Sequence, residues 1–459
     1  MRTATALLCT LLAPSLAQAA PPATPHARDV SAQVQPDNCK KIVQTLVDFG
    51  TRHTLSDTQS PTRGIGAART WIRDEMRRYS QAADGRLRVD FEEFDVPKGP
   101  RVPDGAHIVN VLAVIPGTMK EAAGRAYYVV GHYDSRNGDG MDVKGDAPGA
   151  NDNASGTAVV MECARVLALH PAESTLVFLA TSGEEQSLLG ARAHADKMAL
   201  TKSWLIRGVL NNDIVGDPSA APLGSAPDPR DRTLVRVFSD GLPRNATAEQ
   251  VAQIRSLGSE VDSVSRQLAR YVAETAAIEG CALTPRVTYR LDRFLRGGDH
   301  SCFSDNGFPA VRFSVPKEDY NRQHQDIRRE KDAKGVETQF GDIPEFVDAG
   351  YVADVARLNA TILYNLANAP SVPENARLVT AQLETTTTMR WSSSPEPDVA
   401  GYEVVWRETT NPTWDHVKDV GTATEAKLDL CKDDWFFGVR AYDKDGYRSP
   451  VAFAGASKE

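Results

Sequence analysis

Apolar strand-like runs alternate with amphipathic helix-like stretches from residue 37 to about residue 368, and this alternation constrains the fold most. In chain order the clearest stretches are helix-like 64–79, strand-like 108–115 and 126–131, helix-like 156–169, and strand-like 175–180 and 206–211. Strands this apolar are buried on both sides, which requires helices on both faces of the sheet. We therefore predict an α/β fold with a mixed, mostly parallel sheet sandwiched by helices.

Two further regions follow these runs. A Pro- and Asp-rich loop at 217–232 precedes a strand-like run at 234–238 and one long helical pattern from 248 to 278. After Asn368 a Pro-containing linker leads into short alternating runs bounded by turn residues. This change of pattern predicts a small all-β sandwich at the end of the chain.

The first twenty residues have the pattern of a secretory signal peptide, with Arg2, an apolar run to about Leu16, and small residues ending at Ala19 or Ala20. No later stretch is long and apolar enough to span a bilayer. We therefore predict a secreted or periplasmic protein without stable membrane insertion. The predicted organisation is, in order, a signal peptide at 1–20, an α/β domain at 21–368 and a β-sandwich at 369–459.

The net charge argues against one class of binding partner, and the number of cysteines predicts an unpaired thiol. The formal net charge is −9 and no long block of Lys or Arg occurs, which argues against a nucleic-acid partner. Six cysteines occur and Cys9 lies in the predicted signal peptide, so an odd number remains and at least one thiol is unpaired in an oxidising compartment. Cys281 and Cys302 are the pair that we predict to be bonded. The oligomeric state is not predicted.

Acidic residues and a histidine follow the predicted strands, where ligands bind in α/β sheets. His132 and Asp134 share one face after a strand, and a carboxylate beside an imidazole can orient a metal-bound histidine. A surface His-Asp pair is the alternative for these two residues alone. Asp152 opens a helix, where it is either a cap or a bridge between two cations. Asp213 follows the fourth strand.

Glu184 and Glu185 follow the apolar strand at 175–180, where mutual repulsion raises the cost of ionising both. A dication offsets this repulsion. Neighbouring residues in an extended turn point apart, so one glutamate can bind metal while the other acts as general base toward a water whose pKa the metals lower. A solvated acidic turn is the alternative interpretation.

A histidine late in the α/β domain completes the set, and spacing does not choose between His300 and His324. Two histidines and three carboxylates suit zinc, or cobalt and manganese by substitution. A shared carboxylate suits two metals roughly 3.5–4 Å apart. The strand-end residues therefore predict a two-metal site.

These motifs resemble those of the secreted di-zinc aminopeptidase family, which includes bacterial leucyl aminopeptidases, glutamate carboxypeptidase and the glutaminyl cyclases. The resemblance covers about residues 40–368, and its motifs are His132-x-Asp134, Asn151-Asp152-Asn153-Ala154-Ser155-Gly156, Gly183-Glu184-Glu185 and Asn212-Asp213. It implies these metal ligands: Asp152 bridging two zinc ions, His132 and Asp213 at one ion, and Glu185 and His324 at the other. It also implies Glu184 as the general base and a cis peptide bond between Asp152 and Asn153.

The same resemblance implies further residues near the substrate. His300 is expected to hydrogen-bond substrate or an intermediate, and a tyrosine hydroxyl is expected near the carbonyl oxygen, with Tyr289 and Tyr320 as candidates. Over about residues 371–455 the tail resembles a fibronectin type III domain, except that Trp435 stands where such domains usually carry a tyrosine.

We therefore predict a zinc-dependent aminopeptidase with two Zn²⁺ per chain, peptide or protein N-termini as substrates, and Glu184 and Asp134 as catalytic residues. A carboxypeptidase or dipeptidase of the same fold is an alternative, because arginines near His300 could clamp a substrate carboxylate. These arginines are Arg293, Arg296 and Arg312, and ordinary ion pairs are the simpler interpretation of them. A third hypothesis for the function is a binding protein that has lost catalytic activity. A glutaminyl cyclase is disfavoured by the paired glutamates.

Overall fold

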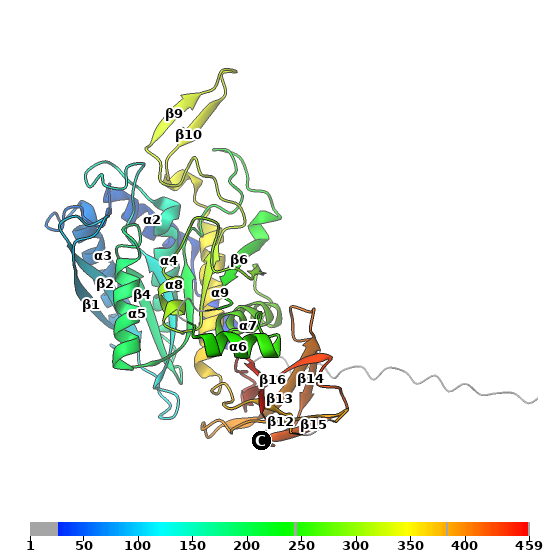
Figure 1. The fold of residues 1–459 in the computed structure, drawn as a ribbon. Coiled ribbons are helices and arrows are strands. Elements are labelled where there is room, and N and C mark those ends of the chain that lie inside the picture. Colours follow the sequence, from blue (N-terminus) through cyan, green and yellow to red (C-terminus); the bar gives the residue numbers. More distant parts are fainter. Residues whose placement is uncertain (1–25, 243–245, 382–383, 458–459) are drawn as a thin grey trace, which may run out of the picture.

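A computed structural model describes residues 26–242, 246–381 and 384–457 (Figure 1). The predicted signal peptide at 1–20 lies outside these residues. An eight-stranded mixed sheet forms the centre, which confirms the predicted fold class. In spatial order its strands are β1 (Arg88–Val96), β2 (Ala106–Ile115), β4 (Thr175–Thr181), β3 (Arg125–His132), β5 (Leu205–Asn212), β8 (Ala310–Ser314), β6 (Leu234–Ser239) and β7 (Thr284–Thr288).

The four central strands, β4, β3, β5 and β8, run parallel to one another. β1, β2 and β6 are each antiparallel to a neighbour, and β7 is parallel to β6. In the parallel part His132 is level with Thr181, and Asn212 is level with Phe313. The carboxyl ends of these strands therefore meet at one edge, where the sequence places its acids and histidine.

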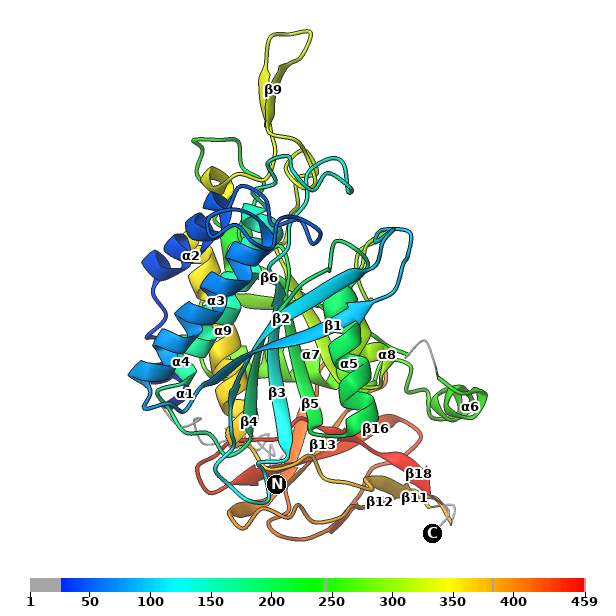
Figure 2. The same cartoon turned by 90° about the vertical axis from the view of Figure 1, so that its left-hand side faces the viewer.

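Helices cover both faces of the sheet, as Figure 2 shows. One face packs against α1 (His26–Ser31), α2 (Pro36–Asp48), α3 (Gly64–Ala82), α4 (Gly156–Leu167), α7 (Val264–Ile278) and α9 (Ala349–Asn368). The other face packs against α5 (Leu189–Thr201) and α8 (His300–Asp305). Alternate residues of one strand enter the two cores: Tyr127 and Val129 enter the first and Tyr128 the second. Among the described helices, none is long and apolar enough to cross a membrane.

The prediction of a single helix at 248–278 is wrong. The chain forms α6 (Ala248–Leu257) and then α7, separated by a turn. Gly258 ends α6 with φ of 63°, a conformation that glycine adopts at little cost, and the Ser263 hydroxyl caps α7 by accepting from the Arg266 amide. Both signals are local and override the continuous helical pattern.

The predicted Cys281–Cys302 disulfide is also wrong, because the five cysteines in the described part of the chain are free thiols. Cys302 is buried with Phe303 in the core beside α5. Cys281 packs against the core on the opposite face of the sheet. The sheet itself therefore separates the two sulfur atoms.

A two-stranded hairpin, β9 (Arg328–Lys331) and β10 (Glu337–Phe340), projects from the end of the molecule opposite the C-terminal strands (Figures 1 and 2). Its strands pair only with each other among the described strands. The hairpin follows His324 in the chain and precedes Asp342, and both of these residues contact the site described below.

After α9, eight strands of the described residues form two four-stranded sheets, in agreement with the predicted β-sandwich. They are, in spatial order, β15 (Glu425–Leu428), β12 (Thr387–Arg390), β11 (Arg377–Val379) and β18 (Gly455–Ser457), and β14 (His416–Asp419), β13 (Val399–Glu408), β16 (Trp435–Asp443) and β17 (Ala452–Phe453). Trp391, Tyr402 and Phe437 belong to the core that the two sheets share. The fibronectin type III resemblance and the domain boundary at 368 stay predictions.

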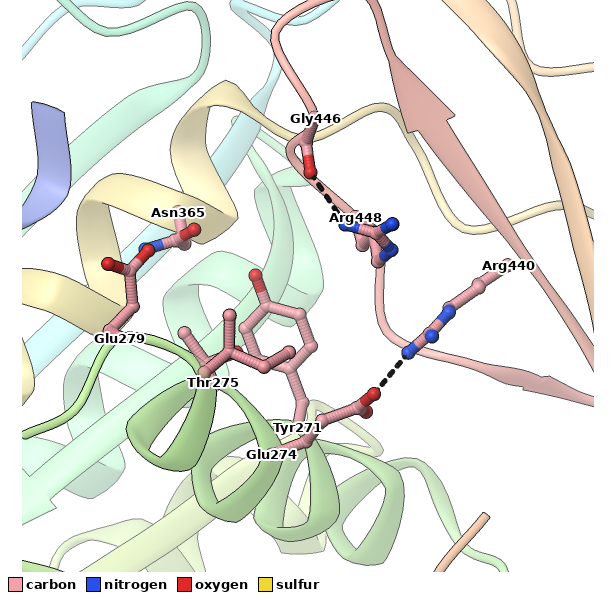
Figure 3. A pocket seen from close by; sticks show the side chains of 9 residues that line it. Tyr271, Glu274, Thr275, Glu279, Asn365, Arg440, Gly446 and Arg448 are labelled. Carbon is pink, nitrogen blue, oxygen red and sulfur yellow. Dashed lines mark hydrogen bonds and ion pairs between the residues drawn. The ribbon is translucent and has the colours of Figure 1, made fainter. Parts of the chain in front are cut away.

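Buried ion pairs join these C-terminal sheets to the α/β part. Asp262, just before α7, lies 2.7 Å from Arg407 of β13 and 2.9 Å from Arg270 of α7. The side chains of Asp262 and Arg407 are both 0% exposed. Arg440 of β16 pairs with Glu274 of α7 at 2.6 Å, beside a cavity of about 20 Å³ (Figure 3). The Asp262–Arg407 pair thus holds two parts of the chain together through charges with little access to water.

Three carboxylates meet at the same junction: Glu173 before β4, and Asp398 and Asp443 from the C-terminal sheets. Each has one buried oxygen without a hydrogen-bond partner among the described residues. Burial, reinforced by the charge of Asp398, raises the pKa of Glu173 to about 8. A carboxyl whose folded pKa is raised binds its proton more tightly in the folded state, so the folded state loses stability as pH rises above the unfolded value.

We expect Glu173→Gln to remove part of this pH dependence. Near pH 4 the variant and the wild type should unfold at similar temperatures, because Glu173 is protonated in both states. As pH rises from about 4.5 to 8, wild-type stability should fall relative to the variant. Thermal unfolding across this pH range measures the difference. The exposed Glu121, changed to Gln, is the control and should not alter the slope; parallel curves for wild type and Glu173→Gln would contradict the assignment.

Candidate metal centre

The carboxyl ends of the parallel strands bring the predicted ligands together. His132 ends β3, Glu184 and Glu185 follow β4, and Asp213 follows β5. Asp152 enters the same edge from the turn Ala150–Ser155, which leads into α4. Parallel strands with level ends therefore gather side chains from distant parts of the chain at one place.

The first group of potential ligands surrounds His132. Its Nε2 lies 3.3 Å from Asp152 Oδ1 and 3.7 Å from Asp213 Oδ1. One ligand atom each of His132, Glu184 and Asp213 lies within 4.8 Å of the other two. A single metal ion can therefore be reached by an imidazole and carboxylates from three segments.

The second group surrounds His324. Its Nε2 lies 2.9 Å from Glu185 Oε1 and 3.1 Å from Asp152 Oδ2. Asp152 thus presents one oxygen to each histidine, which is the position of a bridging carboxylate. The Asp152–Asn153 peptide bond is cis, as the sequence resemblance implied.

The structure selects His324 over His300 as the late histidine. His300 is fully buried in α8, and its Nε2 lies 2.8 Å from the Leu291 carbonyl oxygen. It does not line the pocket that contains the two groups. The expected substrate role of His300 stays a prediction, since the residue is buried and does not belong to the pocket lining.

The charges of this site favour cations. Burial alone would lower the pKa of His132, but the charge of Glu184 and the other carboxylates around the imidazole outweigh this effect and raise that pKa well above its usual range. Burial also lowers the pKa of His324, but the negative charge of Glu185 is the chief effect that outweighs it, and the pKa rises to about 10. Where protons on imidazoles neutralise carboxylates, metal ions can replace those protons.

The donor set fits zinc. His132 Nε2 is buried and has no hydrogen-bond partner in the part of the chain that the structure describes. Two imidazoles together with carboxylate oxygens are the mixed ligands that zinc takes in catalytic sites, and a buried imidazole nitrogen without a partner is a natural ligand atom.

The two groups lie in an open pocket of about 290 Å³. Its lining residues are Arg101, Arg136, Asp152, Glu184, Glu185, Ser187, Leu188, Asp213, Arg293, Leu295, Arg296, Gly297 and His324. A substrate can therefore reach both groups from solvent.

Comparison with known proteins agrees with this geometry. Residues 110–338 match the profile described as Peptidase family M28. A probable zinc metalloprotease of Leptosphaeria maculans is 43% identical over 421 residues, which cover 92% of this chain and 95% of the relative. The chain belongs to peptidase family M28. A probable zinc metalloprotease of Pyrenophora tritici-repentis is 42% identical over 434 residues, covering 94% of this chain and 87% of the relative.

Solved structures share the fold of this M28 chain. The Legionella pneumophila LapA aminopeptidase has a TM-score of 0.50 with 16% identity, covering 75% of both chains. An aminopeptidase from Aneurinibacillus has a TM-score of 0.50 with 13% identity, covering 74% of this chain and 96% of the other. At these identities the likeness is one of fold, and it accords with the predicted zinc aminopeptidase-like sheet.

Asp134 holds the ligands of the M28 site in position. Its carboxylate accepts hydrogen bonds from the Glu184 amide at 3.3 Å, the Glu185 amide at 3.2 Å and the Thr54 hydroxyl at 2.8 Å. Its Oδ1 also lies 3.4 Å from His132 Nδ1. Asp134 is fully buried and does not line the pocket, so it is a positioning residue rather than the catalytic residue that we predicted.

The two candidate tyrosines lie outside the pocket lining. Tyr289 turns toward the C-terminal sheets, where its hydroxyl donates to the Pro412 carbonyl at 3.2 Å, and this contact removes it as a substrate-binding candidate. Tyr320 is 56% exposed beside the pocket, with the Arg296 guanidinium 5.5 Å from its ring centre. Tyr320 therefore lies against Arg296, which lines the pocket.

Sequence reasoning missed one positioning residue, Asp342, and did not show which residues Arg312 contacts. Asp342 accepts hydrogen bonds from the amides of Asn151 and Asp152 at 2.8 and 2.7 Å, which fixes the turn that carries the bridging carboxylate. Arg312 lies 3.0 Å from Asp213 Oδ2 and 2.7 Å from Asp292. Arg312 is therefore occupied by buried ion pairs, and the ordinary interpretation of this arginine is the right one.

Proposed function

We propose that this M28 chain is a zinc-dependent aminopeptidase that binds two zinc ions and hydrolyses the first peptide bond of peptides with a free N-terminus. The observation that carries the proposal is the position of Asp152, whose two oxygens face His132 and His324 separately. This arrangement suits a pair of ions that share one carboxylate. Residues 1–20 support secretion or export to a periplasm as part of the same proposal.

Five residues would hold the two ions: His132 and Asp213 at one, Glu185 and His324 at the other, and Asp152 between them. When bound, the zinc ions supply Lewis acidity toward the scissile carbonyl oxygen and lower the pKa of water. Asp134, Asp342 and Arg312 keep the ligand side chains in place through the contacts described above. The protein thus supplies a preorganised set of ligands at the base of an open pocket.

Glu184 would move the proton. It lines the pocket beside the first group of ligands, and burial raises its pKa well above the usual range. A carboxylate in this place can take a proton from the attacking water, hold it, and deliver it to the leaving amine. The same residue then serves as base and acid in one turnover.

The proposal is tested on the purified protein with a neutral unblocked peptide and its N-acetylated twin. We expect about two zinc ions per chain by elemental analysis and release of the N-terminal amino acid from the unblocked peptide alone. Removal of metal by a chelator should stop hydrolysis, and added zinc should restore it. Cleavage of the acetylated twin from its far end would instead indicate a carboxypeptidase, and a metal-free protein without turnover would indicate a binding protein.

A further inference from the structure

Among the described residues, three of the four arginines that line the pocket have no acidic partner. Arg293 pairs with Glu318 and lies 3.1 Å from Asp292. For Arg101, Arg136 and Arg296, no carboxylate lies within ion-pair distance among the residues that the structure describes. These three side chains, called the arginine rim below, therefore carry charge that the protein itself does not neutralise.

The arginine rim comes from three segments, and two of its members donate to backbone carbonyls. Arg101, between β1 and β2, donates to the Glu185 carbonyl at 2.7 Å. Arg136, after β3, donates to the carbonyls of Asn137 and Gly138 at 3.2 and 3.3 Å. Arg296, between β7 and α8, lies 3.3 Å from His324 Nδ1. The contacts of Arg101 and Arg296 place their guanidinium groups beside ligand residues, Arg136 lines the same pocket, and each group keeps further donors.

The rim determines the charge of the filled pocket. The pocket carboxylates are those of Asp152, Glu184, Glu185 and Asp213. Two zinc ions carry as much positive charge as these four groups carry negative charge, so the three rim arginines remain as excess positive charge. This step rests on the proposed function, because it assumes that both ions are bound.

We propose that the arginine rim selects substrates that carry a carboxylate within one residue of the scissile bond. Guanidinium groups bind carboxylates through paired hydrogen bonds, and they repel the ammonium group of a lysine side chain. Two parts of a short peptide offer this carboxylate: the acidic side chain of the N-terminal residue, and the free C-terminus of a dipeptide. The pocket is small for a ligand site, which suits a substrate of this size.

The test compares neutral and anionic dipeptides on the zinc-loaded protein. Glu-Ala amide against Gln-Ala amide tests the side-chain carboxylate, and Gln-Ala against Gln-Ala amide tests the C-terminal one. We expect kcat/KM to be about tenfold higher or more for the anionic member of at least one pair, mainly through KM, because a charge-assisted hydrogen bond has this effect. Whichever pair responds identifies the source of the carboxylate.

Variants connect the preference to the rim. Arg101→Gln, Arg136→Gln and Arg296→Gln should each lower the ratio of anionic to neutral kcat/KM severalfold, and Arg296→Lys should restore part of it. Arg290 is a matched control on the segment that carries Arg296, because it stacks 3.6 Å from the Phe294 ring centre and does not line the pocket. Arg290→Gln should leave the ratio unchanged.

Binding is measured separately from turnover with the zinc-loaded Glu184→Gln variant. Calorimetry should give a Kd about tenfold lower for the anionic dipeptide than for the neutral one. Equal kcat/KM for all dipeptides, or a preference for Lys-Ala amide, would contradict the proposed substrate preference. Either result would still be consistent with the proposed aminopeptidase activity. Failure to cleave any peptide with a free N-terminus would instead count against the proposed function.

Discussion

Glu184→Gln is expected to lose at least about 10²–10⁴-fold in kcat while the protein keeps its zinc. The amide has the shape of the carboxylate but cannot take the proton of the attacking water. Glu184 lies beside His132 and Asp213, so its position alone also permits a role as a metal ligand. Parallel measurement of kcat and zinc content separates the two roles.

Glu185→Gln is the matched comparison for this experiment. Glu185 follows Glu184 directly and contacts His324 at 2.9 Å. Its replacement should lower zinc affinity, with activity recovering in part at high zinc concentration. Glu184→Gln activity should not recover with zinc. Near-normal rates in Glu184→Gln, or loss of one zinc ion, would show that Glu184 is not the general base.

Asp262→Leu is expected to destabilise the protein by about 3–5 kcal/mol, because removal of one member of a buried ion pair leaves charge uncompensated. Here two guanidinium groups, those of Arg270 and Arg407, lose the same carboxylate. Chemical denaturation followed by fluorescence measures the free energy of unfolding. The double variant Asp262→Leu/Arg407→Met should be less destabilised than the single variant, since one buried charge is then removed with its partner.

The control for this prediction is an exposed ion pair. Lys98 and Asp104 lie 3.5 Å apart with side chains 73% and 94% exposed. Asp104→Asn should change stability by no more than about 0.5 kcal/mol. If Asp262→Leu were equally mild, the contact between the C-terminal sheets and α7 would contribute little to folding.

The candidate ligands His132, Glu185 and Asp213 were predictable because each follows an apolar strand. His324, in contrast, was chosen over His300 only through the family resemblance. The apolar strands 126–131, 175–180 and 206–211 are visible in the sequence, and in a parallel sheet their ends must meet. Strand β8 was not delimited from the sequence pattern, because the charged Arg312 interrupts its short apolar run, AVRFS. Strand β1, RVDFEEFDV, has an acidic exposed side at the edge of the sheet, which hides its strand pattern.

The residues that support the site could not be predicted in the same way. Asp342 acts on backbone amides 190 and 191 positions earlier in the chain, and a lone aspartate carries no sign of this contact. Arg312 was noticed for its charge, but only the structure shows that Asp213 and Asp292 occupy it. Conversely, Arg101 lies far from every motif in the sequence, and Arg136, although only two residues after Asp134, has no pattern that predicts its place in the pocket lining.

The hairpin β9–β10 lies between two residues that are both fixed to Asp152. His324 contacts the Asp152 carboxylate, and Asp342 accepts from the Asp152 amide. The segment between them is therefore a closed loop with a fixed base, and the entropy of closing such a loop grows slowly, by about 0.6 kcal/mol for each doubling of its length. The tip of this hairpin is thus a place where evolution or protein engineering can lengthen the chain, for instance with a peptide tag or a recognition sequence, while the metal ligands keep their geometry.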